Sequence, residues 1–233
     1  LLTGRSESGD VLPLYVSTFG DYNPIGYDYL AIIPVAVFGL NEFSTRSPAA
    51  LFGALTVFPL FYLSFLLFKN TKISLLSAFL LAISPWHIML SRGSAETLVA
   101  LFFVIAGFAL LIDSLTSSSG RKLILTTAVL SISFFIYPAP RFFVTLFYMV
   151  IFFYLNFSLH IKRKYKIFAV LSFTFLVLLI MGLVFAIPGG TARFKQTSIF
   201  NYPETRLVME EQYREDGSTS VPLIFARAFH NKL

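Results

Sequence analysis

The feature that most constrains this 233-residue chain is a series of six long apolar runs. A helix needs about 20 apolar residues to cross a bilayer, and these runs approach that length. Because lipid offers no solvent to satisfy backbone polar groups, only helices or closed barrels can span it, and the runs lack the alternating pattern of barrel strands. The sequence therefore predicts an all-α, polytopic transmembrane bundle. The predicted spans are residues 47–68, 73–90, 97–115, 122–137, 141–159 and 167–187.

Composition agrees with a membrane protein and excludes several other classes. Hydrophobic residues form 56% of the chain and charged residues 13%, whereas soluble domains contain roughly 25% charged residues. The net charge of +6 is spread over short loops, so we interpret it as a topology signal and expect no nucleic-acid partner. The sequence contains no cysteine, which excludes disulfides, thiolate metal sites and a cysteine nucleophile.

The basic loops predict the orientation of the bundle. The loop at 160–166 carries four Lys or Arg side chains and no acid, which assigns it to the cytoplasm. Alternation of the spans places the basic loops at 69–72 and 121–122 on the same side. Every acidic residue except Asp113 then falls on the other side. We therefore expect an integral protein of a bacterial or archaeal plasma membrane, with its site facing outside.

A shorter apolar segment at 25–40 contains Asp28 and Pro34. If it crossed the membrane, the preceding loop would lie in the cytoplasm, away from the other acidic loops. We therefore expect an amphipathic helix in the plane of the outer surface. The expected organisation is a first outer loop at 1–46, a bundle at 47–187 and the start of a long outer loop at 188–233.

Three local signals predict where helices begin or bend. Ser47 and Pro48 are typical of an N-cap followed by the first helical residue, and predict the start of the first span. Pro85, near the end of the run 73–90, predicts a kink there. Ser94 is a plausible N-cap for the next span.

The stretch 84–96 is the most polar interruption between two spans. Glu96 falls in the first turn of the following helix, where it either complements the helix dipole or acts as a functional acid. We consider three interpretations of Arg92: it pairs with Glu96, it binds a lipid phosphate through paired hydrogen bonds, or it snorkels to headgroups. We interpret His87 as an interfacial histidine, with catalysis as the alternative.

The N-terminal loop interleaves acids with tyrosines, and the predicted topology places it on the same side as Arg92 and Glu96. Any single member is ordinarily a solvated loop residue. Together they supply carboxylates for base chemistry beside a cation for an anionic leaving group. Arg46 follows the loop and is placed to snorkel to lipid phosphates. The loop residues are Glu7, Asp10, Tyr15, Asp21, Tyr22, Tyr27, Asp28 and Tyr29.

Several short motifs occur along the chain in a characteristic order. They are GRSESG at 4–9, PLY at 13–15, FGDYNP at 19–24, YDYL at 27–30, FGLN at 38–41, RSPAALFG at 46–53, SPWH at 84–87 with SR at 91–92, and FHNK at 229–232. Each motif alone is weak. Their order and spacing resemble membrane glycosyltransferases of the protein-mannosyltransferase and aminoarabinose-transferase type.

This resemblance implies the GT-C fold, in which a first outer loop with in-plane helices packs over a helical bundle. It implies transfer of a sugar from a polyprenyl-phosphate carrier, with an acid early in the first outer loop as the base. In relatives that acid lies upstream of the position matching Gly4, which here would be upstream of Leu1. We therefore expect a fragment lacking the first helix and the C-terminal part. Asn23 falls near a lysine of aminoarabinose transferases, which argues against that sugar, whereas Glu96 falls near the second-loop acid.

The sequence thus predicts a glycosyltransferase that moves a sugar from a polyprenyl-phosphate donor to a hydroxyl of a lipid, glycan or protein. Nothing in it fixes a cofactor, and a divalent metal is left open. A transporter or flippase of lipid-linked sugars is the alternative, although no internal repeat or broken helix is evident. A passive scaffold would leave the clustered acids unexplained. The predicted catalytic residues are Glu96, Glu7 and Asp21, besides the main loop acid expected upstream of Leu1, and the predicted substrate-binding residues are Arg92, His87, Tyr22, Tyr27 and Arg46.

Overall fold

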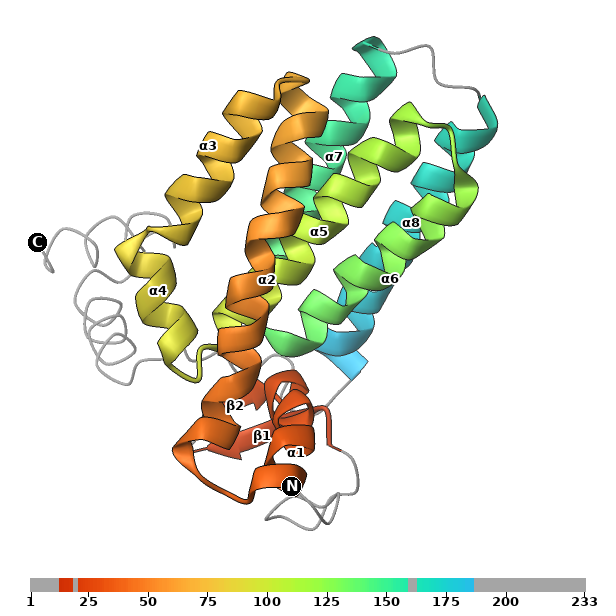
Figure 1. Cartoon of the computed structure of the whole chain (residues 1–233). Helices are drawn as coiled ribbons and strands as arrows, with labels where there is room; N and C mark the ends of the chain where they lie inside the picture. Colours follow the sequence, from red (N-terminus) through yellow and green to blue (C-terminus); the bar gives the residue numbers. More distant parts are fainter. Residues whose placement is uncertain (1–12, 19–20, 159–162, 187–233) are drawn as a thin grey trace, which may run out of the picture.

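The computed structural model describes residues 13–18, 21–158 and 163–186, which form a helical bundle with a two-stranded hairpin at one end (Figure 1). The all-α prediction is confirmed, with the hairpin as the exception. The elements are β1 (Tyr15–Thr18), β2 (Asp21–Pro24), α1 (Gly26–Phe38), α2 (Glu42–Phe68), α3 (Thr71–Ala82), α4 (Pro85–Arg92), α5 (Glu96–Thr116), α6 (Gly120–Ile136), α7 (Pro140–Ser158), α8 (Arg163–Met181) and a π-helical turn, η1 (Gly182–Ala186).

Three helices in the described part of the chain are long and apolar enough to cross a membrane by themselves. They are α2, α5 and the continuous segment Arg163–Phe185 formed by α8 and η1. The pair α3 and α4 adds a fourth span if the two helices are counted together. Helices α6 and α7 lie beside these in the bundle (Figure 1). The fold therefore agrees with a membrane bundle, while the number of six spans stays a prediction.

The predicted span 73–90 is not one continuous helix. Helix α3 ends at Ala82, and α4 begins at Pro85 at an angle of 53° to it. Proline is tolerated in the first turn because the N–H that it lacks has no intrahelical partner there. Pro85 therefore opens a new helix instead of kinking the end of an old one.

The first long helix, α2, begins earlier than Ser47 and Pro48 predict. Asn41 is its N-cap, and the Asn41 side chain accepts a hydrogen bond from the Ser44 N–H at 2.9 Å. Pro48 lies inside the helix and cannot donate to the Ser44 carbonyl four residues earlier. The Ser47 hydroxyl donates to that carbonyl instead, at 2.9 Å. This substitution allows the helix to run through the proline, so the predicted start at Ser47 is wrong.

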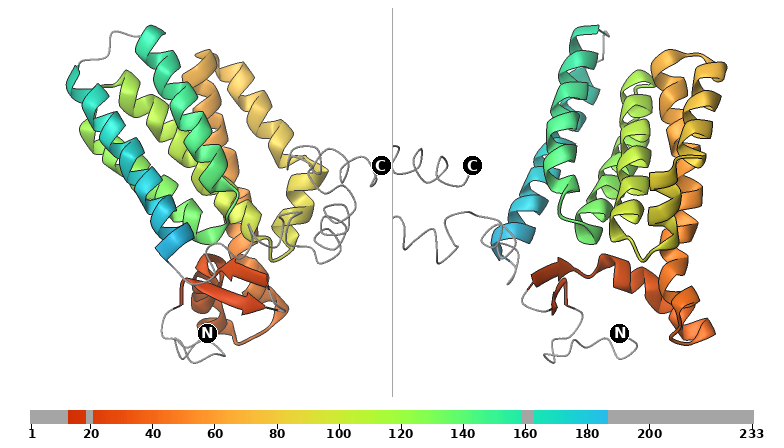
Figure 2. Two further views of the ribbon diagram at one scale, coloured as in Figure 1. Left: turned by 180° about the vertical axis from the view of Figure 1, so that it is seen from behind. Right: turned by 90° about the vertical axis from the view of Figure 1, so that its left-hand side faces the viewer.

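The two ends of the bundle differ in charge and in the elements they carry. One end contains the α2–α3 connection, the α5–α6 connection and the start of α8, and it bears the basic loops (Figure 1). The other end carries the hairpin, α1 and the α6–α7 connection (Figure 2). We call these the basic end and the loop-bearing end. Loops that the sequence assigns to one side of the membrane therefore lie at one end of the bundle.

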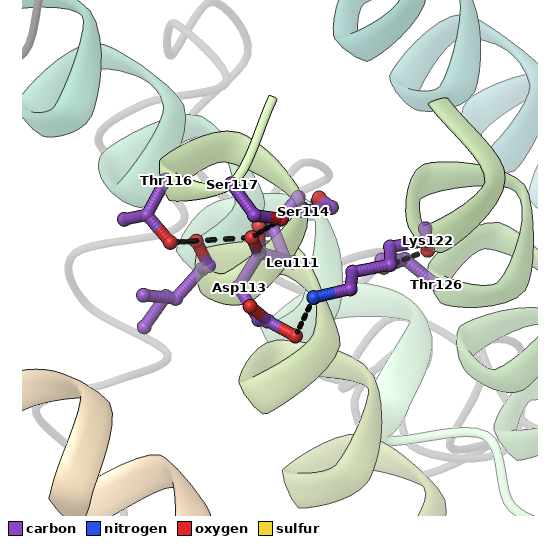
Figure 3. Close-up of polar contacts among 8 residues, drawn as sticks. Leu111, Asp113, Ser114, Thr116, Ser117, Lys122 and Thr126 are labelled. Carbon is purple, nitrogen blue, oxygen red and sulfur yellow. Dashed lines mark hydrogen bonds and ion pairs between the residues drawn. The ribbon is translucent and has the colours of Figure 1, made fainter. Parts of the chain in front are cut away.

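Asp113 is the one acid that the charge pattern leaves at the basic end. Its Oδ2 lies 2.7 Å from Lys122 Nζ, in an ion pair between the last turn of α5 and the first turn of α6 (Figure 3). The Ser117 hydroxyl donates to the Asp113 carbonyl at 2.6 Å and helps to end α5. Asp113 thus neutralises one of the basic loop charges, and it takes no part in the cluster at the other end.

Helix α1 runs across the loop-bearing end of the bundle (Figure 2, right). Its first residue, Gly26, packs so closely on α6 that an added Cβ would lie 2.4 Å from the Phe135 carbonyl oxygen. The hairpin attaches to α1 through the Ile25 N–H, which donates to the Leu14 carbonyl at 3.2 Å. The helix expected over 25–40 is therefore present, while its position in the membrane plane stays a prediction. Part of the segment expected to be loop, 15–24, forms paired strands.

The main core lies between α5, α6, α7 and α8. Gly107 of α5 allows α6 to approach closely, because a Cβ there would lie 2.3 Å from Leu130 Cδ2. Two polar contacts join the helices across this core: the Thr127 and Ser172 hydroxyls are 2.6 Å apart, and the Tyr148 hydroxyl donates to the Ala169 carbonyl at 3.1 Å. Small residues and hydroxyl bonds at helix contacts are typical of bundles in lipid.

Candidate functional site

Tyr27, in the first turn of α1, is the centre of a polar cluster at the loop-bearing end. Its ring is buried, and its hydroxyl donates to the Thr45 carbonyl of α2 at 2.7 Å. The Ser94 side chain and the carboxylates of Asp28 and Glu96 lie close enough to influence its ionisation. Residues from α1, α2, the α4–α5 connection and α5 therefore converge here. We call Tyr27, Asp28, Ser94 and Glu96 the Tyr27 cluster.

A small apolar core holds this cluster in place. The Tyr27 ring packs in a buried group with Ala49 of α2, Val99 and Ala100 of α5, and Ile136 at the end of α6. The two alanines leave room for an aromatic ring between the helices. Glu96 begins α5 one turn before Ala100, which sets its carboxylate at the edge of this core.

The electrostatics of the cluster follow from burial. Burial raises the pKa of the Asp28 carboxyl above its ordinary value, which makes its anion a stronger base than a solvated aspartate. Burial also raises the pKa of Tyr27, and the negative charges of Asp28 and Glu96 add to the rise. Tyr27 therefore stays protonated as a hydrogen-bond donor, while Asp28 accepts a proton more readily than a solvated aspartate does.

Glu96 is the first residue of α5 and is half-buried. The N-cap position is Ala95, which has no side chain for capping, so the prediction of Ser94 as the N-cap is wrong. A carboxylate at this position complements the positive end of the helix dipole. The position also places it beside Tyr27, so the electrostatic and functional interpretations of Glu96 are compatible.

His87 and Arg92 lie on α4 and differ in surroundings. His87 is buried, with Nε2 3.0 Å from the Gly53 carbonyl oxygen of α2. Because a carbonyl oxygen can only accept a hydrogen bond, Nε2 carries the proton. The hydrogen bond from His87 connects α4 to α2. Arg92 ends α4 with an exposed side chain, and its pairing with Glu96 stays a prediction. Arg92 is therefore accessible to an anion from outside the bundle.

Three further predicted residues lie on α2 and β2. Arg46 is exposed and forms a surface ion pair with Glu42, with Nη1 3.2 Å from Oε2. Asp21 and Tyr22 belong to β2, opposite Thr18 and Ser17 of β1, and only their backbones are described.

Several predictions fall outside the described residues. Glu7 and Asp10 lie in the segment 1–12. The long outer loop expected at 188–233 begins after the last described residue. The main loop acid that the resemblance places upstream of Leu1 is not part of this sequence. Of the predicted catalytic acids Glu96, Glu7 and Asp21, Glu96 is the one whose side chain lies within the described part of the structure, and the upstream acid stays a prediction.

Sequence reasoning missed two residues at this end. The sequence marks Asp28 only as one of several loop acids. Its burial is not evident because it follows Tyr27 in a segment that contains other polar residues. Arg141 falls at the head of a predicted span, yet its guanidinium is buried against Phe134 and Tyr15. A cation directly after Pro138 and Pro140, at the start of an apolar run, is the available signal.

An apolar groove of about 570 Å³ runs along the bundle from the cluster toward the basic end. One face of α5, from Thr97 to Ile112, lines it over a rise of about 22 Å at 1.5 Å per residue. Leu63 and Leu67 of α2 and one face of α7 complete the walls. Thr97 follows Glu96 directly, so the groove opens beside the Tyr27 cluster. Its length and apolar lining suit a hydrocarbon chain lying across one leaflet.

No group of three or more His, Cys, Asp or Glu side chains is placed to hold a metal ion within the described residues.

Comparison with known proteins identifies one family. The model of the family described as dolichyl-phosphate-mannose-protein mannosyltransferase matches residues 22–187. The matched region begins in β2 and includes α1, the Tyr27 cluster and every wall of the groove. No curated protein and no solved structure matches the chain.

Proposed function

Because the chain belongs to the dolichyl-phosphate-mannose-protein mannosyltransferase family, we propose that it transfers a sugar from a polyprenyl-phosphate donor to a hydroxyl acceptor at the loop-bearing end. Membership makes it a membrane glycosyltransferase of the mannosyltransferase type. The observation that supports the finer statement is the meeting of two carboxylates, from α1 and α5, around Tyr27 at the mouth of an apolar groove.

The donor divides into parts that match these features. Its hydrocarbon chain would occupy the groove between α2, α5 and α7, which has the depth and lining of a lipid site. Its phosphate would then lie at the mouth of the groove, where the exposed Arg92 side chain can reach an anion. The sugar would face the Tyr27 cluster.

The reaction needs a base and a stabilised leaving group. In the proposed step, Asp28 or Glu96 removes the proton of the acceptor hydroxyl, whose oxygen forms a bond to the anomeric carbon. The bond from that carbon to the phosphate oxygen breaks, and the phosphate leaves with the electron pair. Arg92 stabilises the developing negative charge. Tyr27 stays protonated and serves to orient the acceptor or a carboxylate.

A transporter of lipid-linked sugars remains the second candidate because of one observation. The 53° break between α3 and α4 is the kind of discontinuity that transporters place at their binding sites. A transporter would move the donor across the membrane unchanged, whereas a transferase consumes it. Measuring donor chemistry therefore separates the two candidates.

The proposed step can be tested with carboxylate variants in the natural protein. Asp28→Asn and Glu96→Gln should each lower turnover of a radiolabelled polyprenyl-phosphate mannose, by about 100-fold for the residue that acts as base. Glu42→Gln is the matched control, since Glu42 is an exposed carboxylate paired at the surface with Arg46. Near-normal turnover in both Asp28→Asn and Glu96→Gln would exclude the Tyr27 cluster as the source of the base.

A further inference from the structure

Arg141 is the most deeply buried cation in the described part of the chain, with 6% of its surface exposed. The described residues place no carboxylate in an ion pair with it, and its Nε–H is buried without a partner among them. Burying a charge without a counter-charge is costly. The desolvation cost of burying Arg141 therefore suggests that it has a specific role at the loop-bearing end.

The first contact of Arg141 follows from the sequence of the α6–α7 connection. In a regular helix the Phe134 carbonyl would accept from the N–H of residue 138, but residue 138 is proline and has none. Arg141 Nη2 donates to this carbonyl instead, at 2.9 Å. Arg141 therefore caps the C-terminal end of α6 from the first turn of α7.

The second contact of Arg141 reaches the first outer loop. The guanidinium carbon lies 5.5 Å from the centre of the Tyr15 ring in β1, within the range of a cation–π interaction. The Tyr15 hydroxyl in turn donates to the Leu183 carbonyl of the π-helical turn, at 3.2 Å. Tyr15 is therefore held from two sides, and Arg141 joins the hairpin to the ends of α6, α7 and η1.

The hairpin passes this constraint on to α1. The Leu14 carbonyl accepts from the Ile25 N–H, and the Pro13 carbonyl accepts from the Tyr29 hydroxyl at 2.8 Å. Both contacts flank Asp28 in the sequence. The position of the Asp28 carboxylate over the end of the bundle thus depends on where Arg141 holds Tyr15.

The direction of the Arg141 side chain excludes a direct contact with a lipid in the groove. Pro140, Phe143 and Phe147 line the groove. Arg141 falls on a different face of α7, together with the buried Val144 and Tyr148, which pack toward α6 and α8. Arg141 therefore acts through the loop, not on the hydrocarbon chain of a donor.

We propose that Arg141 is a positioning residue that latches the first outer loop, through Tyr15, onto the outer ends of α6 and α8 and so sets the position of Asp28. The effect on catalysis rests on the function proposed above, while the latch itself does not.

The latch is tested by a distance and a rate in the natural protein. Because this chain contains no cysteine, spin labels can be attached at Val37→Cys on α1 and Ile124→Cys on α6, both exposed positions. We expect one narrow distance distribution in the parent and a broadened one in Arg141→Met. Arg141→Lys should restore part of the order, because lysine keeps the charge but not the planar fork. Arg121→Ala is the matched control, since Arg121 is exposed at the opposite end of α6.

The rate measurement separates positioning from substrate binding. Displacement of Asp28 by about 1 Å predicts a fall in kcat of about 100-fold with little change in the KM for the donor. Tyr15→Leu should reproduce both effects while leaving the Arg141 bond to Phe134 intact, and it serves as the test if Arg141→Met does not fold. Unchanged distance distributions in Arg141→Met or Tyr15→Leu overturn the latch. If the variants show a broadened distribution but the parent protein itself shows no transfer, the latch is upheld and only the proposed function is contradicted.

Discussion

Replacing Gly26 by alanine tests whether the position of α1 controls the site. The added Cβ would lie 2.4 Å from the Phe135 carbonyl oxygen and 2.8 Å from its carbon, both backbone atoms that cannot rotate away. Ordinary contact begins at 3.4 Å, so α1 must move by 3.4 − 2.4, or about 1 Å. Tyr27 and Asp28 follow directly and would move with it. A misplacement of this size predicts a fall in kcat of about 100-fold, with an overpacking cost of about 1–3 kcal/mol in stability.

Gly120→Ala is a closely matched control for this change. Gly120 is also the first residue of a helix, and an added Cβ there meets nothing within 4 Å. Both variants would be purified in lipid nanodiscs, assayed for sugar transfer and followed by thermal unfolding. We expect Gly120→Ala to match the parent in both measurements. Equal turnover by Gly26→Ala and Gly120→Ala would refute the dependence of the site on the seating of α1.

The remaining predictions concern electrostatics, packing and topology. Burial raises the folded-state pKa of the Asp28 carboxyl, so the stability that this shift contributes is present below the unfolded pKa of 3.8 and is lost as pH rises through the folded pKa. Asp28→Asn should therefore raise Tm at pH 7 but not near pH 3.5. A lower Tm of Asp28→Asn at pH 7 would contradict this prediction. Gly107→Ala should lower the free energy of unfolding by about 1–3 kcal/mol by crowding Leu130, whereas Gly182→Ala should not, as measured by thermal unfolding. Adding Leu130→Ala to Gly107→Ala should relieve the crowding. A cysteine at Val37 should be labelled from outside intact cells and one at Ser118 should not; the reverse pattern would overturn the orientation.

The overall architecture was predictable because it depends on properties that sequence records directly. Apolar length marks the spans, and the acid-free loops around Lys69, Arg121 and Lys164 mark one end of the bundle. The short helix at Gly26–Phe38 followed from charge placement, since a crossing there would have separated the acidic loops. These features rest on sums over many residues, so single exceptions such as the Asp113–Lys122 pair do not disturb them.

Helix ends were less predictable because they depend on individual hydrogen bonds. The Ser47 hydroxyl replaces the donor that Pro48 lacks, so a start signal in sequence becomes the interior of α2. Strands β1 and β2 have four residues each, and β2 contains aspartate, asparagine and proline, which are rare in strands. Pairing with each other and docking on the bundle outweigh that local preference.

The sequence predicted the site residues whose placement follows from topology, but not the burial that sets others apart. Topology placed Tyr27 and Glu96 on one side, and the fold brings Glu96 and Asp28 together around Tyr27. Burial distinguishes His87 and Arg141 from other polar residues at the interface, and it depends on how α4 packs on α2 and how Tyr15 of the hairpin lies against Arg141 of α7. Neither contact leaves a pattern in the local sequence.

The most direct test of the central claim is to follow the fate of the donor. The natural protein, reconstituted in liposomes, would be given a polyprenyl-phosphate mannose labelled in the sugar, with a hydroxyl-bearing acceptor on the side of α1. A transferase predicts that labelled mannose appears on the acceptor as an equal amount of polyprenyl phosphate is released. It also predicts that Asp28→Asn or Glu96→Gln, whichever removes the base, lowers both by about 100-fold. Intact donor that changes leaflet without loss of its sugar would contradict the claim and identify a transporter.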